Sequence, residues 1–271
     1  MKSLYLAEWE TFIRYREISG KGRTLVYLPG LGLPSVEQFI SVVTHADMIG
    51  YHSLLIDYIG SGFSDNSTGF DYSIENHARS VAAVLDSEGA KSCTVIGHSM
   101  GGTVAIMLAI LRPDLVSKLI VAEANISPGG GEATRRIASY SEIEYVNEAH
   151  QTFPEEVRKA EKEGDMTAVF INAAWSKADP SGLYKSSVAL VELGETFKGQ
   201  FQKMPIPRTF IYGEKSLPKD RSEERPDVPD PDELETFGVQ IAIVPNAGHA
   251  MMFDNLPGFV NILKQAILSR A

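Results

Sequence analysis

The chain has 271 residues, 44% of them hydrophobic and 22% charged, proportions typical of a globular protein large enough to bury its own core. Lys and Arg number 25 against 35 for Asp and Glu, and this net charge of −10 argues against binding to nucleic acid or to an anionic membrane. The single cysteine, Cys93, excludes an intrachain disulfide. No stretch resembles a secretory signal or a transmembrane helix, so we expect a cytoplasmic protein.

Short apolar segments alternate with helical patterns along the first half of the chain. Residues 11–16 alternate apolar and polar side chains, as in a strand with one face in water. Later runs are continuously apolar, which is typical of strands covered on both faces: 24–28, 53–57, 93–97 and 118–122. Helical patterns separate them at 35–49, 74–88 and 100–112. This alternation predicts the α/β class, with helices flanking a mostly parallel sheet.

The alternation is interrupted between residues 126 and 204. This stretch is polar and helix-prone, begins near three consecutive glycines (129–131) and ends before Pro205-Ile206-Pro207. The core pattern then resumes with strands at 208–213 and 240–244 and a final amphipathic helix at 257–269. We therefore predict a core formed by residues 1–125 and 205–271, with a helical insertion at 126–204.

The segment Gly97-His98-Ser99-Met100-Gly101 has the Gly-x-Ser-x-Gly spacing of a nucleophile elbow. An apolar strand precedes it and a helix of small residues follows, so the chain must turn sharply at Ser99. Glycines two positions before and after the serine remove side chains that would collide across such a corner. The N-terminus of the helix places its positive dipole end near any developing negative charge. The spacing predicts Ser99 as a nucleophile.

A serine hydroxyl needs a base to accept its proton. His249 lies in the small-residue loop Asn246-Ala247-Gly248-His249, directly after the last predicted strand. His98 adjoins the serine, but we expect it to point away from it across the turn. Other histidines lie on predicted helices or at strand starts: His45, His52 and His77. His249 is therefore the predicted general base.

These motifs together resemble the α/β-hydrolase superfamily over residues 24–269. The turn Leu28-Pro29-Gly30-Leu31-Gly32 is similar to the oxyanion-hole turn of that family, which implies that the backbone N–H groups of Leu31 and Met100 stabilise an oxyanion. The resemblance also implies that residues 126–204 form a helical cap with the substrate between cap and sheet. Aromatic residues of the cap could line that site or form the cap's own core: Phe153, Phe170, Trp175 and Tyr184.

The acid that orients the histidine departs from the commonest pattern of the family. Many members carry it in a Gly-x-x-Asp turn after the penultimate strand, where this chain has Gly213-Glu214-Lys215-Ser216. Other members place it after the preceding strand, and here Glu123 follows that strand at the carboxyl edge of the sheet. Glu123 is the preferred candidate, while Asp220, Glu214 or a dyad without an acid remain alternatives.

A serine at the elbow argues against dehalogenases and epoxide hydrolases, because the members of the family with those activities use aspartate. An alcohol leaves more readily than an amine, which must be protonated, so we predict hydrolysis of a small or medium carboxylic ester through an acyl-enzyme at Ser99. The alternatives are a carbon–carbon bond hydrolase using the same triad and a non-enzymatic ligand receptor of the same fold.

The sequence shows no metal-ligand cluster and no phosphate-binding loop, so we expect a small-molecule substrate, no metal and no cofactor. It does not predict the substrate or the oligomeric state.

Overall fold

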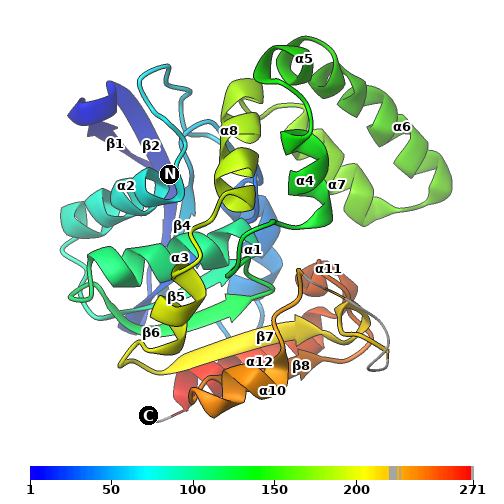
Figure 1. The fold of residues 1–271 in the computed structure, drawn as a ribbon. Helices are drawn as coiled ribbons and strands as arrows, with labels where there is room; N and C mark the ends of the chain where they lie inside the picture. The colour runs from blue at the N-terminus through cyan, green and yellow to red at the C-terminus, as the bar shows by residue number, and fades with distance from the viewer. Residues whose placement is uncertain (220–224, 226, 270–271) are drawn as a thin grey trace.

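The computed structural model describes residues 1–219, 225 and 227–269, and these residues contain one sheet of eight strands in the order β1-β2-β4-β3-β5-β6-β7-β8 (Figure 1). The strands are β1 (Lys2–Leu6), β2 (Thr11–Ile18), β3 (Lys21–Leu28), β4 (Tyr51–Asp57), β5 (Cys93–His98), β6 (Val116–Ala122), β7 (Arg208–Gly213) and β8 (Gln240–Val244). β1 and β4 each pair antiparallel with β2, and the remaining pairs are parallel. The predicted α/β class and mostly parallel sheet are confirmed. The sequence analysis missed strand β1.

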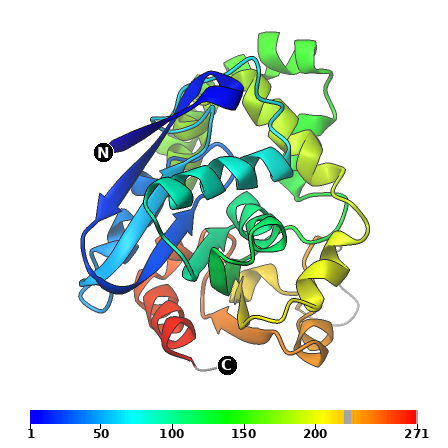
Figure 2. The ribbon, with the colours of Figure 1, turned by 90° about the vertical axis from the view of Figure 1, so that its left-hand side faces the viewer.

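Helices cover both faces of the sheet (Figure 1, Figure 2). α2 (Ile74–Ser87) and α3 (Met100–Leu111) pack on one face, whereas α1 (Ser35–Val43) and α12 (Leu256–Leu268) pack on the other. Neighbouring residues of one strand enter opposite cores, as Val95 and Ile96 of β5 do, because successive side chains of a strand point to opposite faces. A central strand therefore has to be apolar at every position. α1 is shorter than predicted and ends at Val43, and turns lead from there to β4.

The parallel register brings the loops after several strands to one edge of the sheet. Leu28 of β3 lies opposite Gly97 of β5, His98 opposite Ala122 of β6, and Ala122 opposite Ile211 of β7. The residues that follow these positions include Ser99 and Glu123. This carboxyl edge is where open α/β sheets bind their ligands.

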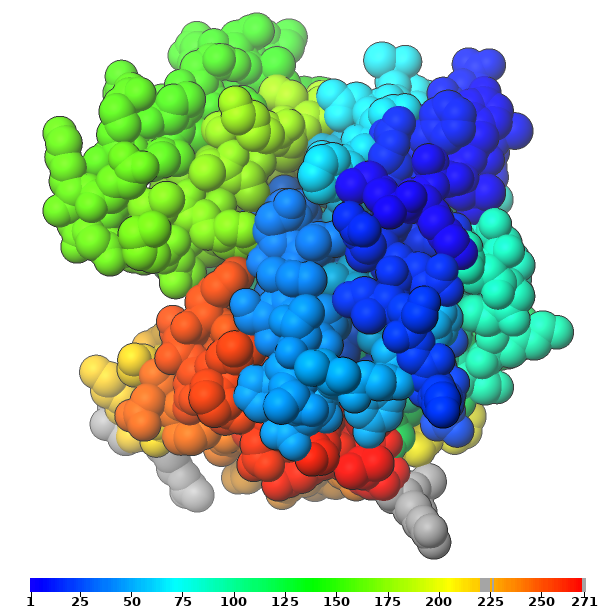
Figure 3. Space-filling model, turned by 180° about the vertical axis from the view of Figure 1, so that it is seen from behind, coloured from blue at the N-terminus to red at the C-terminus, as the bar shows by residue number. Residues whose placement is uncertain are grey.

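A run of helices connects β6 to β7. It contains α4 (Glu132–Ala138), α5 (Glu142–Asn147), α6 (Phe153–Glu163), α7 (Met166–Trp175), α8 (Pro180–Val191) and α9 (Phe197–Gln202). In the space-filling view the helices drawn in green form a lobe, and a notch separates this lobe from the orange segment near the C-terminus (Figure 3). That residues 126–204 act as a cap over a substrate remains a prediction.

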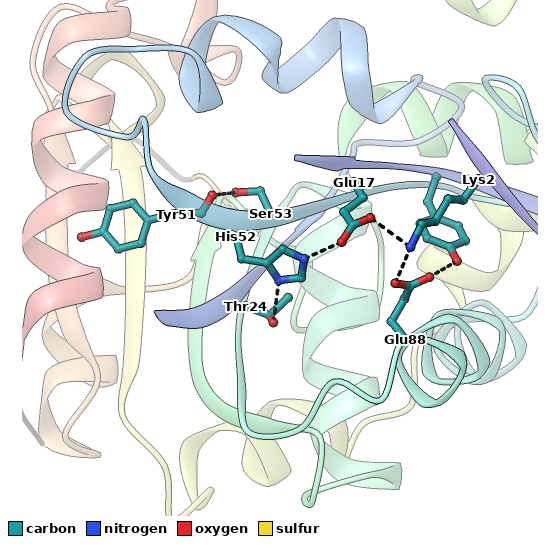
Figure 4. A network of polar contacts seen from close by, with 8 residues as sticks. Lys2, Glu17, Thr24, Tyr51, His52, Ser53 and Glu88 are labelled. Carbon is teal, nitrogen blue, oxygen red and sulfur yellow. Dashed lines mark hydrogen bonds and ion pairs between the residues drawn. The ribbon is translucent and has the colours of Figure 1, made fainter. Parts of the chain in front are cut away.

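A polar network ties β1, β2, β3 and β4 to the end of α2 (Figure 4). Lys2 forms ion pairs with Glu88 (2.7 Å) and Glu17 (2.9 Å), and Tyr15 also contacts Glu88. His52 joins Glu17 to Thr24, at 3.0 Å on either side. Thr24 and His52 lie towards the first residues of β3 and β4, at the opposite end of the sheet from the edge that holds Ser99. The network is partly exposed to water, so we assign it a modest stabilising role away from that edge.

The connection between β7 and α12 contains α10 (Pro231–Thr236), which packs on β8, and α11 (Met251–Asp254), which follows the loop of His249. Across the described ranges, no helix combines the length and the hydropathy needed to cross a bilayer.

Candidate active site

Ser99 occupies the corner between β5 and α3. Its backbone has φ 53° and ψ −124°, a conformation that residues other than glycine rarely adopt. Its N–H donates a hydrogen bond to the carbonyl oxygen of Ala122 on the neighbouring strand at 2.8 Å. The strained turn expected from the Gly-x-Ser-x-Gly spacing is therefore present.

Close backbone contacts explain the glycines around this corner. A Cβ atom on Gly97 would lie 2.2 Å from the carbonyl oxygen of Gly101, and one on Gly101 would lie 2.1 Å from that of Leu28. Both distances are far inside van der Waals contact, so a side chain at either position would force the backbone apart. The same approach brings the turn after β3 next to Ser99.

Glu123 and His249 are joined by a hydrogen bond at the carboxyl edge of the sheet. The Oε2 atom of Glu123 lies 2.7 Å from Nδ1 of His249, and its Oε1 accepts a hydrogen bond from the N–H of Gly213 at 2.8 Å. Burial alone would raise the pKa of Glu123, but hydrogen bonds from His249, Ser216 and the Gly213 N–H outweigh burial and hold the pKa below its usual value. Glu123 is therefore an ionised carboxylate, 9% exposed at its side chain, beside an imidazole that is 54% exposed.

The other candidate acids occupy different places. Glu214 accepts a hydrogen bond from the backbone N–H of Asn246 at 2.7 Å, so it holds the loop that carries His249 rather than its ring. Ser216, at the position where many family members have the acid, hydrogen-bonds to Glu123. Asp220 lies outside the described residues.

Among the described residues, two backbone N–H groups near Ser99 have no protein acceptor. The carbonyl oxygen of Gly30 accepts a hydrogen bond from the N–H of Leu33 at 3.1 Å, which closes the turn after β3. Because a trans peptide points its C=O and N–H in opposite directions, the Leu31 N–H is directed out of that turn. Within the described chain, neither this N–H nor that of Met100, the first residue of α3, donates to another residue. Both groups can therefore bind an external acceptor.

His98 is buried, and its ring nitrogens contact residues other than Ser99. Its Nε2 lies 2.8 Å from the carbonyl oxygen of His249, and its Nδ1 lies 2.9 Å from Nε2 of Gln38. Burial and the neighbouring His249 lower the pKa of His98 to about 3, so its ring is neutral, with Nε2–H donating to His249 and Nδ1 accepting from Gln38. The Gln38 Oε1 in turn accepts from the N–H of Gly30 at 2.9 Å. The sequence analysis missed Gln38, because its position within a helix carries no local signal of this role.

A cavity of about 820 Å³ is lined by Ser99 and His249. This volume is typical of a site for a small molecule. The core contributes Leu31, Glu123 and Phe253 to its walls, and the insertion contributes Ile171 and Trp175. The Ser99 hydroxyl makes no hydrogen bond to His249 or to any other residue of the described chain. Such bonds are often long in an empty active site and tighten when substrate binds.

The aromatic residues singled out in the insertion differ in position. Trp175 lines the cavity, whereas Phe153 packs behind it with ring centroids 5.5 Å apart. The ring centroids of Phe170 and of Phe253 in the core lie 5.0 Å apart, and those of Tyr184 and Tyr145 within the insertion lie 5.9 Å apart.

A second hollow, of about 660 Å³, lies between β1 and α2, away from Ser99.

Known proteins resemble the chain both in sequence and in fold. A sequence model of the alpha/beta hydrolase fold matches residues 23–141, the stretch that contains the turn after β3, the elbow and Glu123. An esterase from Exiguobacterium antarcticum superimposes with a TM-score of 0.77 over 98% of this chain and 99% of its own, at 19% identity. The chain therefore has the α/β-hydrolase fold. The α/β-hydrolase fold expected from the motifs is thus confirmed.

Two relatives by sequence differ in how much of the chain they match. N-formylmaleamate deformylase from Pseudomonas putida is 26% identical over 261 residues, which cover 90% of this α/β-hydrolase and 88% of the relative. RutD from Pseudomonas syringae, a candidate carbamate hydrolase, is 40% identical over 78 residues. That second match spans less than a third of either chain, 29% here and 30% of RutD, so it gives no information on the rest of the molecule.

Proposed function

We propose that this α/β-hydrolase is a serine hydrolase that cleaves a carboxylic ester of small or medium size through an acyl-enzyme at Ser99. The observation that supports this most is the ionised, buried carboxylate of Glu123 paired with His249 in the cavity that also contains Ser99. A carboxylate in this position fixes the tautomer of the imidazole, since Nδ1 must carry the proton that it donates to Glu123. Nε2 is then free to accept a proton.

In the proposed reaction His249 Nε2 takes the hydroxyl proton of Ser99 while Oγ attacks the acyl carbonyl carbon. The carbonyl oxygen becomes an oxyanion, which accepts hydrogen bonds from the N–H groups of Leu31 and Met100. The intermediate collapses to an acyl-enzyme as the C–O bond to the alcohol breaks, and His249 passes its proton to the leaving oxygen. Water, activated by His249 in the same way, then releases the acid and restores Ser99. Glu123 stabilises the imidazolium in both halves of the reaction.

The walls of the cavity favour an acyl or alkoxy group with apolar character. Leu31, Leu33 and Phe253 approach it from the core, and Ile171 and Trp175 from the insertion. Placing the substrate between these two sets of residues gives the segment 126–204 the role of a cap. Removing apolar surface of the substrate from water into this cavity contributes a favourable transfer free energy of roughly 25 cal/mol for each Å².

Amide cleavage is a second candidate, favoured by the match to a deformylase over most of the chain. An amine is a poorer leaving group than an alcohol, so His249 must protonate the nitrogen as the C–N bond breaks. A panel of matched esters, amides and diketones distinguishes ester, amide and carbon–carbon hydrolysis directly.

The proposal is tested by turnover of p-nitrophenyl acetate and butyrate in the wild type and in Ser99→Ala. We expect the substitution to lower turnover by about 10³-fold or more and to abolish labelling by a fluorophosphonate. Ser139→Ala is the matched control, because Ser139 is an exposed serine of the insertion whose hydroxyl donates a hydrogen bond to a local carbonyl, that of Arg136. Labelling that survives in Ser99→Ala would refute the assignment. A wild type that is neither labelled nor active on any member of the panel would favour the ligand-receptor alternative.

A further inference from the structure

The insertion donates a hydrogen bond to the turn beside Ser99. The indole N–H of Trp175, the last residue of α7, donates to the carbonyl oxygen of Leu31 at 2.6 Å. The two residues are 144 positions apart, and both are largely buried, with Trp175 8% and Leu31 6% exposed. This bond links the helical insertion to the turn that supplies one of the two unpaired N–H groups.

The hydrogen bond acts on the peptide that the turn itself leaves unfixed. In the four-residue turn Gly30–Leu33, the hydrogen bond from the Leu33 N–H to the Gly30 carbonyl oxygen closes the turn. The central peptide, between Leu31 and Gly32, has two orientations compatible with the same closing bond, which distinguish type I from type II turns. Gly32 has φ 64°, a value that the type II orientation requires and that glycine adopts at no steric cost. Donation from Trp175 to the Leu31 carbonyl oxygen stabilises one of these two orientations.

The insertion packs tightly around this point. A Cβ atom on Gly32 would lie 2.6 Å from Cδ1 of Leu183 and 3.0 Å from Cδ1 of Trp175, so α7 and α8 lie directly on the turn. Trp175 is held from behind, because its carbonyl oxygen accepts from Nε2 of His150 at 2.9 Å and its ring packs against Phe153. The indole N–H is thus presented to the turn by a rigid group of side chains.

The core holds the other end of the same turn. The N–H of Gly30 donates to Gln38, which also contacts the buried ring of His98. Leu31 lies between these two anchors, with Gln38 on the side of the core and Trp175 on the side of the insertion. If the bond from Trp175 is lost, the peptide between Leu31 and Gly32 is free to rotate. The backbone of Leu31 then keeps only the anchor on its N-terminal side, which is the hydrogen bond from the Gly30 N–H to Gln38.

We infer that Trp175 is a positioning residue for the oxyanion hole, an inference that rests on the proposed function. Its indole N–H holds the carbonyl group of Leu31 and thereby fixes the backbone of this residue, so that the Leu31 N–H stays directed at the oxyanion. Oxyanion stabilisation therefore depends on the docked position of the insertion. The oxyanion exists only in the transition state and the tetrahedral intermediate, so loss of this bond slows turnover without weakening substrate binding.

The test compares Trp175→Phe with Trp9→Phe. The chain has two tryptophans, and Trp9 is a matched control because it is equally buried (7% exposed) and packs on Phe70, away from the cavity. Phenylalanine keeps most of the aromatic packing and removes the N–H.

For p-nitrophenyl acetate we expect Trp175→Phe to lower kcat about tenfold, while KM changes less than about twofold. The expected loss is smaller than the 10²- to 10³-fold effect of removing an oxyanion donor outright, because the Leu31 N–H itself remains. Affinity for a trifluoromethyl ketone, which forms a tetrahedral adduct with the serine, should fall by the same factor as kcat. Trp9→Phe should change none of these quantities.

A second variant covers the case in which Trp175→Phe fails to fold. Phe153→Leu loosens the packing behind the indole without removing its N–H, and we expect a smaller loss of kcat, again with KM unchanged. Normal kcat and normal inhibitor affinity in folded Trp175→Phe would overturn the inference and leave the proposed function intact. A rise in KM with kcat unchanged would do the same. Normal kcat in Phe153→Leu would overturn it as well if Trp175→Phe does not fold. A wild type that neither turns over esters nor reacts with fluorophosphonate would refute the proposed function, and the inference with it.

Discussion

Glu123 and His249 are 126 positions apart in the chain, yet the Glu123 carboxylate lies 2.7 Å from Nδ1 of the His249 ring. Glu123 directly follows a buried strand, while His249 lies on an exposed loop that follows the last strand. The buried acid is held by the Gly213 N–H and by Ser216, so the buried member of the pair can orient the exposed one. This geometry is the basis for the first prediction.

Glu123→Gln should lower ester turnover by about 10²- to 10⁴-fold, because a neutral amide cannot stabilise the imidazolium that forms during the reaction. Steady-state kinetics with p-nitrophenyl butyrate measures the effect. Glu214→Gln is the matched control, since Glu214 holds the loop of His249 through Asn246 without contacting the ring, and it should cost less than about tenfold. Asp220→Asn should also cost less than about tenfold. Near-normal turnover in Glu123→Gln would show that Glu123 is not the acid that orients His249.

Ser99→Gly should give a more stable protein than Ser99→Ala, by about 1 kcal/mol. A non-glycine residue at φ 53° and ψ −124° costs on the order of 1–3 kcal/mol, whereas glycine adopts this conformation freely and loses roughly 0.5–1 kcal/mol more chain entropy on folding. Thermal and urea unfolding of the two inactive variants measure the difference. The same pair of substitutions at Ser139, where φ is −75°, should show the opposite order. An identical order at both positions would show that Ser99 is not strained.

Gln38→Leu should destabilise the fold by about 2–4 kcal/mol. The substitution leaves the Gly30 N–H and the Nδ1 atom of His98 buried without their partner, and each unsatisfied group costs about 1–3 kcal/mol. Gln265→Leu, at an exposed glutamine of α12, should change the free energy of unfolding by less than about 0.5 kcal/mol. Equal stability of the two variants would show that the buried amide contributes nothing.

Stability should fall as the pH drops below about 6.5, the usual pKa of histidine, in part because of His77. Burial lowers the pKa of His77 to about 3, so the unfolded chain takes up a proton that the folded protein excludes. Its contribution is complete above pH 6.5 and is lost progressively towards pH 3. In urea unfolding, the wild type should lose roughly 1.4 kcal/mol more per pH unit than His77→Gln between pH 6 and pH 4.

Asp57 acts in the opposite direction, because burial raises its pKa to about 6 and the folded protein gains stability when it is protonated. Its contribution, like that of buried His98, is common to the wild type and His77→Gln and cancels in the comparison. Parallel stability curves for the two proteins would contradict the assignment to His77.

The alternation of apolar runs and helical patterns was enough to predict the α/β class, because a strand buried on both faces must be apolar at every position. Strand β1 was missed because it lies at the edge of the sheet with four of its five residues partly or fully exposed, so its sequence has no such run. The end of α1 was placed six residues too late, since the apolar spacing continues into the turns after Val43.

The sequence by itself determined the local chemistry of the elbow. Five consecutive residues specify a strained corner, and the glycines that permit it must lie within a few positions of Ser99. The tertiary structure decided which distant groups meet there: Glu123 at His249, Gln38 at His98, and Trp175 at the Leu31 carbonyl. Each of these contacts depends on the register of parallel strands or on where the insertion docks. A hydrogen bond between residues 60 to 144 positions apart imposes no periodicity on the sequence around either partner, so only the folded chain reveals it.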